Sequence, residues 1–185
     1  MTKKSASIGI VETSSIARGI EVADAMMKTA SVEMVVNRTI CPGKYMVLIG
    51  GTVDAVQASV EAGVEAGAHT VVDHFVIANI HPDVFPAING VAHVPKMRAL
   101  GVVESFSVAS TIEAADAAMK CADVELVSIH LAMAIGGKAY VSMTGDVAAV
   151  TSAVETASKL IGKKGLLVDS VVMASPDPRV VREFI

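Results

Sequence analysis

The chain has 185 residues, a net charge of -4 at pH 7 and a hydrophobic fraction of 52%, with only 18% charged residues. It offers no basic patch for nucleic acid, its two cysteines make no disulfide framework, and its apolar runs are too short to span a membrane. The start of the chain lacks the apolar stretch and cleavage site of a signal peptide, so the expected location is cytoplasmic. The excess of apolar residues predicts burial at interfaces between subunits.

The first half of the chain has the pattern of a β-α-β-β-α-β module followed by a short helix. Gly67 is placed to end the second helix, and Pro82 suits the first turn of the short one. The Ile-Cys-Pro-Gly segment at 40–43 has the composition of a turn between two strands. In chain order, the expected elements are a strand at 7–12, a helix ending near 30, strands at 32–39 and 44–49, a helix at 53–66 and a strand at 71–78.

The first of these helices has a clear start signal and an apolar stripe. Either Ser14 or Ser15 can cap it, because a serine oxygen accepts a hydrogen bond from the free N–H groups of the first turn. Apolar side chains spaced three to four residues apart are typical of an amphipathic helix. The apolar residues that fall on one face here are Ile16, Ile20, Ala23 and Met27.

The second half of the chain repeats the first in the same order, which indicates a tandem duplication. Gly90 and Pro95 mark a linker near 89–99, so two α+β domains are predicted, at 1–90 and 99–185. Each domain is small, and its thin core gains from packing against further protein. The matching segments are 8–12 with 100–104, 23–28 with 115–120, 32–35 with 124–127, 51–56 with 145–150, and 82–84 with 178–180.

These repeated motifs resemble the BMC domain of bacterial microcompartment shells. The resemblance rests on the opening Gly-apolar-apolar-Glu strand, the Ala-Asp-Ala-Met-x-Lys segment at 23–28, and the hairpin that ends in Gly-Lys. It implies two tandem α/β domains of the α+β, ferredoxin-like type, each a mainly antiparallel sheet with flanking helices. It also implies a homotrimer that imitates a hexamer and joins other shell proteins in a facet of the microcompartment shell, a structural role and not an enzyme. By the same resemblance, Lys28 and Lys120 make lateral assembly contacts.

The first repeat is similar to one branch of this family, the tandem T-type proteins of propanediol-utilisation microcompartments. The segments 38–44 and 78–82 carry that similarity. It implies that the hairpin loop, with Ile40, Pro42 and Gly43, faces the three-fold axis of the trimer. It further implies that Cys41 from each of three subunits binds one [4Fe–4S] cluster per trimer. Lys44 is the last residue of the segment 38–44 that carries this similarity.

Residue chemistry alone leaves Cys41 open between two interpretations. One cysteine per chain cannot hold an iron–sulfur cluster, whereas a three-fold axis brings three equivalent thiols to one point. The simpler interpretation is a free thiol in a turn. The second repeat has a loop at 131–137 that is two residues longer and lacks cysteine, and Cys121 at a helix end is expected to be structural. The family's Pro-Arg-Pro-His after the last strand is missing from both repeats.

Several functions follow from these alternatives. The first is a shell protein whose axial cluster passes electrons across the shell, with an encapsulated or cytosolic redox enzyme as a further partner. A metal-free shell protein whose central pore conducts small metabolites is the second. A small-ligand-binding module built from similar elements is a third. An enzyme is disfavoured, because the sequence has no paired carboxylate motif, no Ser/His/Asp arrangement and no nucleotide fingerprint.

Overall fold

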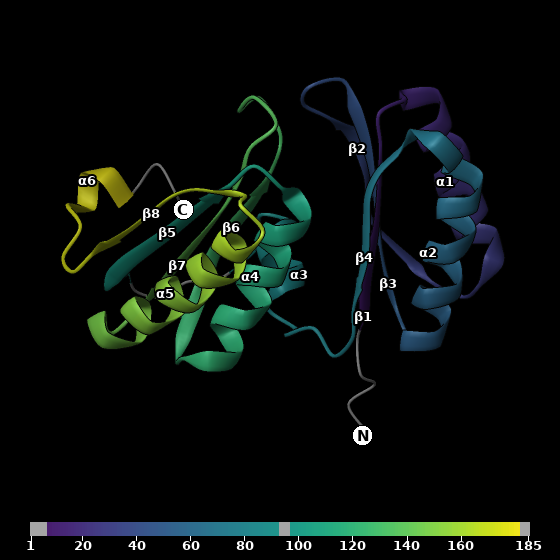
Figure 1. Cartoon of the computed structure of the whole chain (residues 1–185). Coiled ribbons are helices and arrows are strands. Elements are labelled where there is room, and N and C mark those ends of the chain that lie inside the picture. Colours follow the sequence, from purple (N-terminus) through teal and green to yellow (C-terminus); the bar gives the residue numbers. More distant parts are fainter. Residues whose placement is uncertain (1–6, 93–96, 182–185) are drawn as a thin grey trace. The chain divides into compact units, whose positions relative to one another are not determined.

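The structure is a computed structural model that describes residues 7–92 and 97–181, and the chain divides into two compact units, Met1–Ile80 and His81–Ile185. Each unit contains a four-stranded antiparallel sheet with two long helices packed on it (Figure 1). The fold class predicted from the sequence is therefore confirmed. None of the helices in the described ranges is long and apolar enough to cross a membrane.

The first unit has the strand order β2-β3-β1-β4, so the first strand in the sequence lies inside the sheet. β1 pairs with β3 along its whole length and with β4 on its other side. The hydrophobic core of the first unit is formed by residues of β1, β3, α1 and α2. The elements are β1 (Ser7–Thr13), α1 (Ile16–Thr29), β2 (Glu33–Ile40), β3 (Lys44–Gly51), α2 (Val53–Gly67), a 3-10 turn (Ala68–Thr70) and β4 (Val71–Ile77).

The second unit repeats this topology with the strand order β6-β7-β5-β8, as a tandem duplication requires. Pro178, the repeat equivalent of Pro82, opens α6 directly after Asp177. The elements are α3 (Val84–Ile88), β5 (Ala99–Ser105), α4 (Val108–Cys121), β6 (Val124–Leu131), β7 (Ala139–Gly145), α5 (Val147–Lys163), β8 (Leu167–Met173) and α6 (Pro178–Val181).

The short helix α3 closes the first repeat in the sequence, yet it packs on β6 and α4 of the second unit. The repeat ends near residue 90, whereas packing assigns residues 81–90 to the second unit. Repetition marks how far the duplicated segment extends, but burial of apolar side chains decides where a short helix lies. Pro82 was expected in the first turn of this helix, and it lies instead in a turn just before α3.

Helix α1 begins as predicted, but its buried face is largely different from the predicted stripe. Ser15 is the cap, and its side chain accepts a hydrogen bond from the Arg18 N–H at 3.3 Å. Of the predicted stripe, only Ala23 is buried. A helix can carry two apolar stripes, and spacing alone does not say which one faces its own sheet. The residues packed inside the unit are Gly19, Val22, Ala23 and Met26, whereas Ile16, Ile20 and Met27 are exposed.

The helix α1 approaches β3 so closely at Gly19 that no side chain fits there. A Cβ atom at this position would overlap the Cβ and ring of Tyr45. At the equivalent positions the second unit has Thr111 and Ala139, both fully buried, so the larger side chain is on the helix and the smaller one is on the strand. The two repeats therefore fill the same space between helix and strand in opposite ways. The larger side chain is on the strand in the first unit and on the helix in the second.

We expect Gly19→Ala to lower the free energy of unfolding by about 1–3 kcal/mol, because the new methyl group overpacks a rigid contact. Gly162→Ala on α5 is the matched control, since a Cβ there has no neighbour within 4 Å. The free energy of unfolding of the control should rise by up to about 1 kcal/mol, because alanine has a higher helix propensity than glycine. Urea unfolding followed by circular dichroism measures both. Equal stabilisation by the two substitutions would contradict the close contact at Tyr45.

Candidate functional site: the Cys41 hairpin

Cys41 lies at the tip of the hairpin between β2 and β3. The two strands pair up to Ile40 and Lys44, and residues 41–43 form the turn. Gly43 has a φ of 74°, a left-handed conformation that favours glycine at this point of a tight turn. Ile40 was expected in the loop, but it is the last residue of β2 and is buried. The loop at the tip of the hairpin therefore consists of Cys41, Pro42 and Gly43, and its place at a three-fold axis stays a prediction.

The two cysteines differ in their surroundings. Cys41 is a half-buried free thiol that makes no hydrogen bond within the described ranges. Cys121, at the end of α4, donates to the carbonyl oxygen of Ala118 at 3.3 Å and lies 3.9 Å from that of Ser152. The thiol of Cys121 is thus held by its own helix, while that of Cys41 is free to meet a ligand.

Within residues 7–92 and 97–181, a single chain brings no metal centre together. Among the residues that the structure describes, no three His, Cys, Asp or Glu side chains come together as a metal site. A cluster at Cys41 would need thiolates from further subunits, since iron–sulfur clusters are held by several cysteines. A free thiol at a projecting turn fits the role of one ligand among three.

A buried ion pair supports the base of this hairpin. The Lys44 ammonium group pairs with the Glu12 carboxylate, and Glu12 is only 4% exposed. The second unit has the equivalent pair, Lys138 with Glu104 at 2.5 Å, in a more exposed setting. Both pairs join the first strand of a unit to its hairpin. Sequence analysis used the Gly-Lys and Gly-apolar-apolar-Glu motifs but missed that they meet.

The corresponding loop of the second unit, residues 132–138, has different contacts. Its strands stop one pair earlier, at Leu131 and Ala139, which lengthens the loop beyond the two inserted residues. The His130 ring stacks on Tyr140 with ring centroids 5.3 Å apart, and its Nε2 lies 2.9 Å from the Met133 carbonyl oxygen. The two hairpins of one chain are therefore not equivalent in shape or chemistry.

The two lysines predicted to make lateral contacts lie in the last turns of their helices, and each forms an ion pair within its own helix. Lys28 lies 2.6 Å from Asp24 on α1, and Lys120 lies 2.5 Å from Asp116 on α4. Asp116 also accepts the backbone N–H of His81 at 2.8 Å. The two aspartates thus occupy equivalent positions but have different partners. The lateral role of the two lysines stays a prediction.

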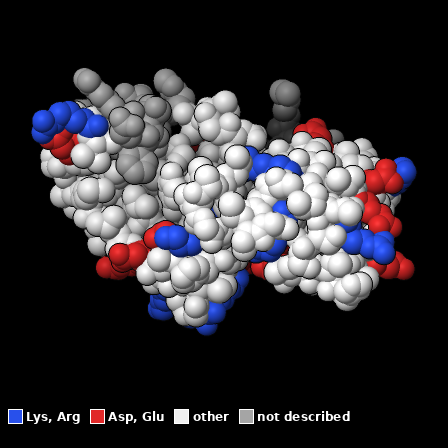
Figure 2. Space-filling model, turned by 90° about the horizontal axis from the view of Figure 1, so that it is seen from above, with Lys and Arg blue, Asp and Glu red and all other residues white. Residues whose placement is uncertain are grey.

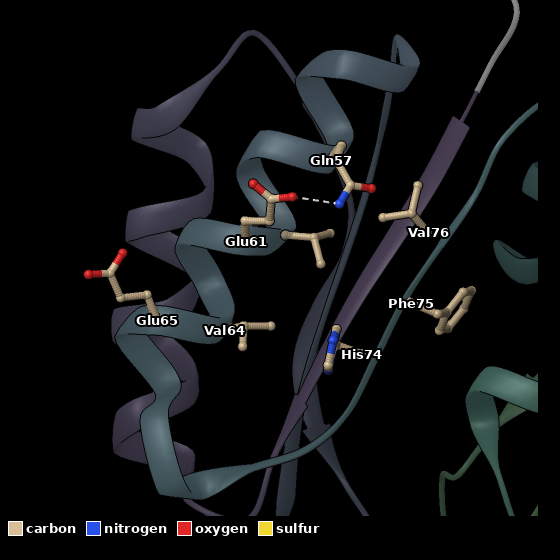
Figure 3. A pocket seen from close by; sticks show the side chains of 8 residues that line it. Gln57, Glu61, Val64, Glu65, His74, Phe75 and Val76 are labelled. Carbon is tan, nitrogen blue, oxygen red and sulfur yellow. Dashed lines mark hydrogen bonds between the residues drawn. The ribbon is translucent and has the colours of Figure 1, made fainter.

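A groove of about 630 Å³ in the first unit lies between α2 and the edge strand β4 (Figure 3). Gln57 donates a hydrogen bond to Glu61 at 2.7 Å, while Glu65 points away from the strand. His74 lies on β4, and no cysteine or serine nucleophile lines the groove. The second repeat replaces His74 by Ser170. The His74 imidazole and the Glu61 carboxylate both line the groove, and Gln57 holds that carboxylate.

Charged side chains are sparse on the face seen in Figure 2, where most of the surface is uncharged. The composition agrees, since charged residues make up only 18% of the chain. Charged residues are depleted at the core of protein–protein interfaces. This supports the expectation of subunit interfaces.

The two domains share one topology and so define a protein built by tandem duplication, and comparison with known proteins identifies the family. The model of the BMC domain matches residues 7–80 and again residues 99–176. The chain therefore belongs to the BMC-domain family and carries two BMC domains in tandem. The resemblance stated from the sequence motifs is confirmed.

The relatives are shell proteins. The chain is 46% identical over 181 residues to the bacterial microcompartment shell protein PduT of Citrobacter freundii, and the match covers 98% of each protein. A crystal structure of a microcompartment protein from Desulfitobacterium hafniense DCB has 50% identity and a TM-score of 0.92, and covers 96% of this chain and 98% of that one. The carboxysome shell protein CcmK2 of Synechococcus elongatus is 37% identical over 78 residues, which cover 40% of this chain and 76% of that protein. The chain is thus a structural shell protein of a bacterial microcompartment, as predicted.

Proposed function

We propose that three copies of this chain form a shell trimer whose axis carries a [4Fe–4S] cluster, bound by one Cys41 from each subunit, and that this centre transfers electrons across the shell. The observation that carries the proposal is the free thiol at the tip of the first hairpin. When bound, such a cluster supplies one-electron transfer. The trimer itself, the cluster and its redox role are all parts of this proposal.

The residues of the hairpin have defined tasks in this proposal. Cys41 binds iron as the thiolate, so it loses its proton on binding. Pro42 restricts the turn and Gly43 takes the left-handed conformation that the turn requires. The Lys44–Glu12 pair ties the base of the hairpin to β1 and so limits its movement. A symmetric trimer then places three identical thiols around its axis.

The partners follow from the same assembly. Further subunits of this chain complete the trimer, and other shell proteins surround it in the facet. An encapsulated or cytosolic redox enzyme exchanges electrons with the centre, while the shell protein itself catalyses no reaction. Lys28 and Lys120 contribute to the lateral contacts of the facet.

The alternative is a metal-free shell protein whose axis is a pore for small metabolites. One observation favours it, because each chain brings a single cysteine to the hairpin and no further metal-ligating side chain joins it within the described ranges. The rim of the pore would then be formed by Cys41 and backbone groups of the turn.

Purification without oxygen tests the proposal, with iron and acid-labile sulfide analysis, an absorbance spectrum and the mass in solution. About four irons and four sulfides per trimer are expected for one shared cluster. A trimer that stays colourless and free of iron after attempted reconstitution would reject the cluster and favour the pore. A mass other than that of a trimer would reject the three-fold site.

A further inference from the structure

The first unit leaves an apolar surface uncovered along α1 and β2. Ile16, Ile20 and Met27 of α1 are exposed, and so is Met34 of the neighbouring strand β2. Ile20 is the extreme case, with 56% of its surface accessible. Ile16, Ile20 and Met27 belong to the stripe that the sequence analysis singled out, and unlike Ala23 they are not used in the unit's own core. We refer to these four residues as the α1/β2 surface.

The duplicated second unit shows the same surface in a buried state. Ile112 on α4 is the repeat equivalent of Ile20, and it is fully buried at 0% exposure. Val108 and Leu126, the equivalents of Ile16 and Met34, are also buried. The chemistry of the two surfaces is alike, so the difference lies in what covers them.

The cover in the second unit is the segment 81–88, which contains α3. This helix packs on α4 and β6, and its Val84 and Ile88 are buried. The backbone N–H of His81 donates to the Asp116 carboxylate, whose side chain is 9% exposed. At the equivalent position of the first unit, the Asp24 side chain is 60% exposed. One short segment thus provides both an apolar cover and a hydrogen bond.

The repeat contains a second segment of this kind, and it lacks the corresponding contacts. Residues 177–181 are the repeat equivalent of 81–85, with Pro178 matching Pro82 and Val180 matching Val84. Val180 is 49% exposed, whereas Val84 is fully buried. Among the described residues, α6 packs on no helix or strand to the extent that α3 does. Residues 177–180 are exposed and only Val181 of the segment is buried, so the chain has one uncovered surface and one segment that is largely free to cover it.

We infer that residues 177–181 of one subunit dock on the α1/β2 surface of another subunit, as residues 81–88 dock on α4 and β6 within the chain. The occupant is a second copy of this chain, because the matching segment and surface lie in the two different repeats, and both are exposed except for Val181 of the segment. The inference deepens the proposed trimer and rests on it. A head-to-tail contact of this type closes into a ring when its rotation allows.

The polar contact of the docked segment also follows from the repeat. The backbone N–H of Asp177 takes the place of the His81 N–H and donates to Asp24 of the neighbouring subunit. Arg179 forms two side-chain hydrogen bonds with Asp177, at 2.9 and 2.8 Å, and these lower the pKa of the Asp177 carboxyl. Its guanidinium group thus compensates the charge that Asp177 brings near Asp24, while Lys28 compensates Asp24 itself.

Substitutions on either side of the contact test its apolar part. Ile20→Glu and Val180→Glu should each raise the protein concentration needed for half-assembly by about tenfold or more, because each places a charge in an apolar contact. Val72→Glu, on the exposed side of β4, is the matched control and should assemble like the unchanged chain. Sedimentation velocity measures assembly, and circular dichroism shows that each variant is folded. Full assembly of both test variants would overturn the inference.

Disulfide trapping tests the position of the contact. In a chain that also carries Cys41→Ser and Cys121→Ser, Asp24→Cys with Asp177→Cys should form reversible disulfides between subunits on mild oxidation, giving covalent trimers. Asp54→Cys with Asp177→Cys is the control pair and should not. An assembled protein of unchanged mass without trapping at 24 and 177 would overturn this docking and leave the trimer standing. Trapping is independent of iron, so the absence of a cluster from the unmodified protein would reject only the redox proposal.

Discussion

Cys41→Ser is expected to remove essentially all iron, sulfide and visible absorbance from the protein while the trimer stays intact. Each trimer loses all three thiolates at once, and a serine hydroxyl, a harder donor that keeps its proton near neutral pH, is a far weaker cluster ligand than a thiolate. The side chain sits in a turn at the tip of the hairpin and makes no hydrogen bond within the described ranges, so the fold does not depend on it.

Cys121→Ser is the matched control for this experiment. Its thiol is held by the carbonyl oxygen of Ala118, and it lies at the end of α4 in the other repeat. The control should keep the iron content of the unchanged protein. Iron analysis and absorbance of anaerobically purified protein, with the mass in solution, measure both variants. A brown Cys41→Ser protein with full iron would place the cluster elsewhere.

The sequence predicts most of the local structure because the signals for it are local. Ser15 caps α1 through a contact three residues away, and the Cys-Pro-Gly turn closes a hairpin between adjacent strands. The duplication adds a strong check, since every element of the second unit recurs in the same order. The equivalent topologies of the two sheets follow directly from it.

The features that the sequence does not predict depend on packing between residues that are far apart in the sequence. The exposed Ile20 and the buried Ile112 have the same residue type and the same place in the repeat, and α3 packs on α4, the helix that carries Ile112. The pairing of Glu12 with Lys44 joins residues 32 positions apart. A comparison of the two repeats could have suggested this pair, because Glu104 and Lys138 recur together.

Removing the lysine of the Glu12–Lys44 pair is expected to have a large effect on the stability of the fold. Lys44→Met is expected to lower the free energy of unfolding by about 3–5 kcal/mol, since it leaves the carboxylate of Glu12 buried without a partner. Lys138→Met is the matched control in the second unit. The side chain of Glu104 is 29% exposed, so water can solvate its carboxylate and the expected loss is about 1 kcal/mol or less.

Urea unfolding of the two methionine variants measures this difference, and a third variant separates charge from packing. Glu12→Gln combined with Lys44→Met removes the buried charge but keeps the shape of the side chain, so it should recover part of the stability lost in Lys44→Met. If the two single variants lose equal stability, burial of Glu12 is not the cause. If the double variant recovers nothing, the aliphatic stem of Lys44 packs the hairpin base and its charge is secondary. A large loss with recovery would mean that the hairpin carrying Cys41 is held in place by a charge pair that both repeats retain.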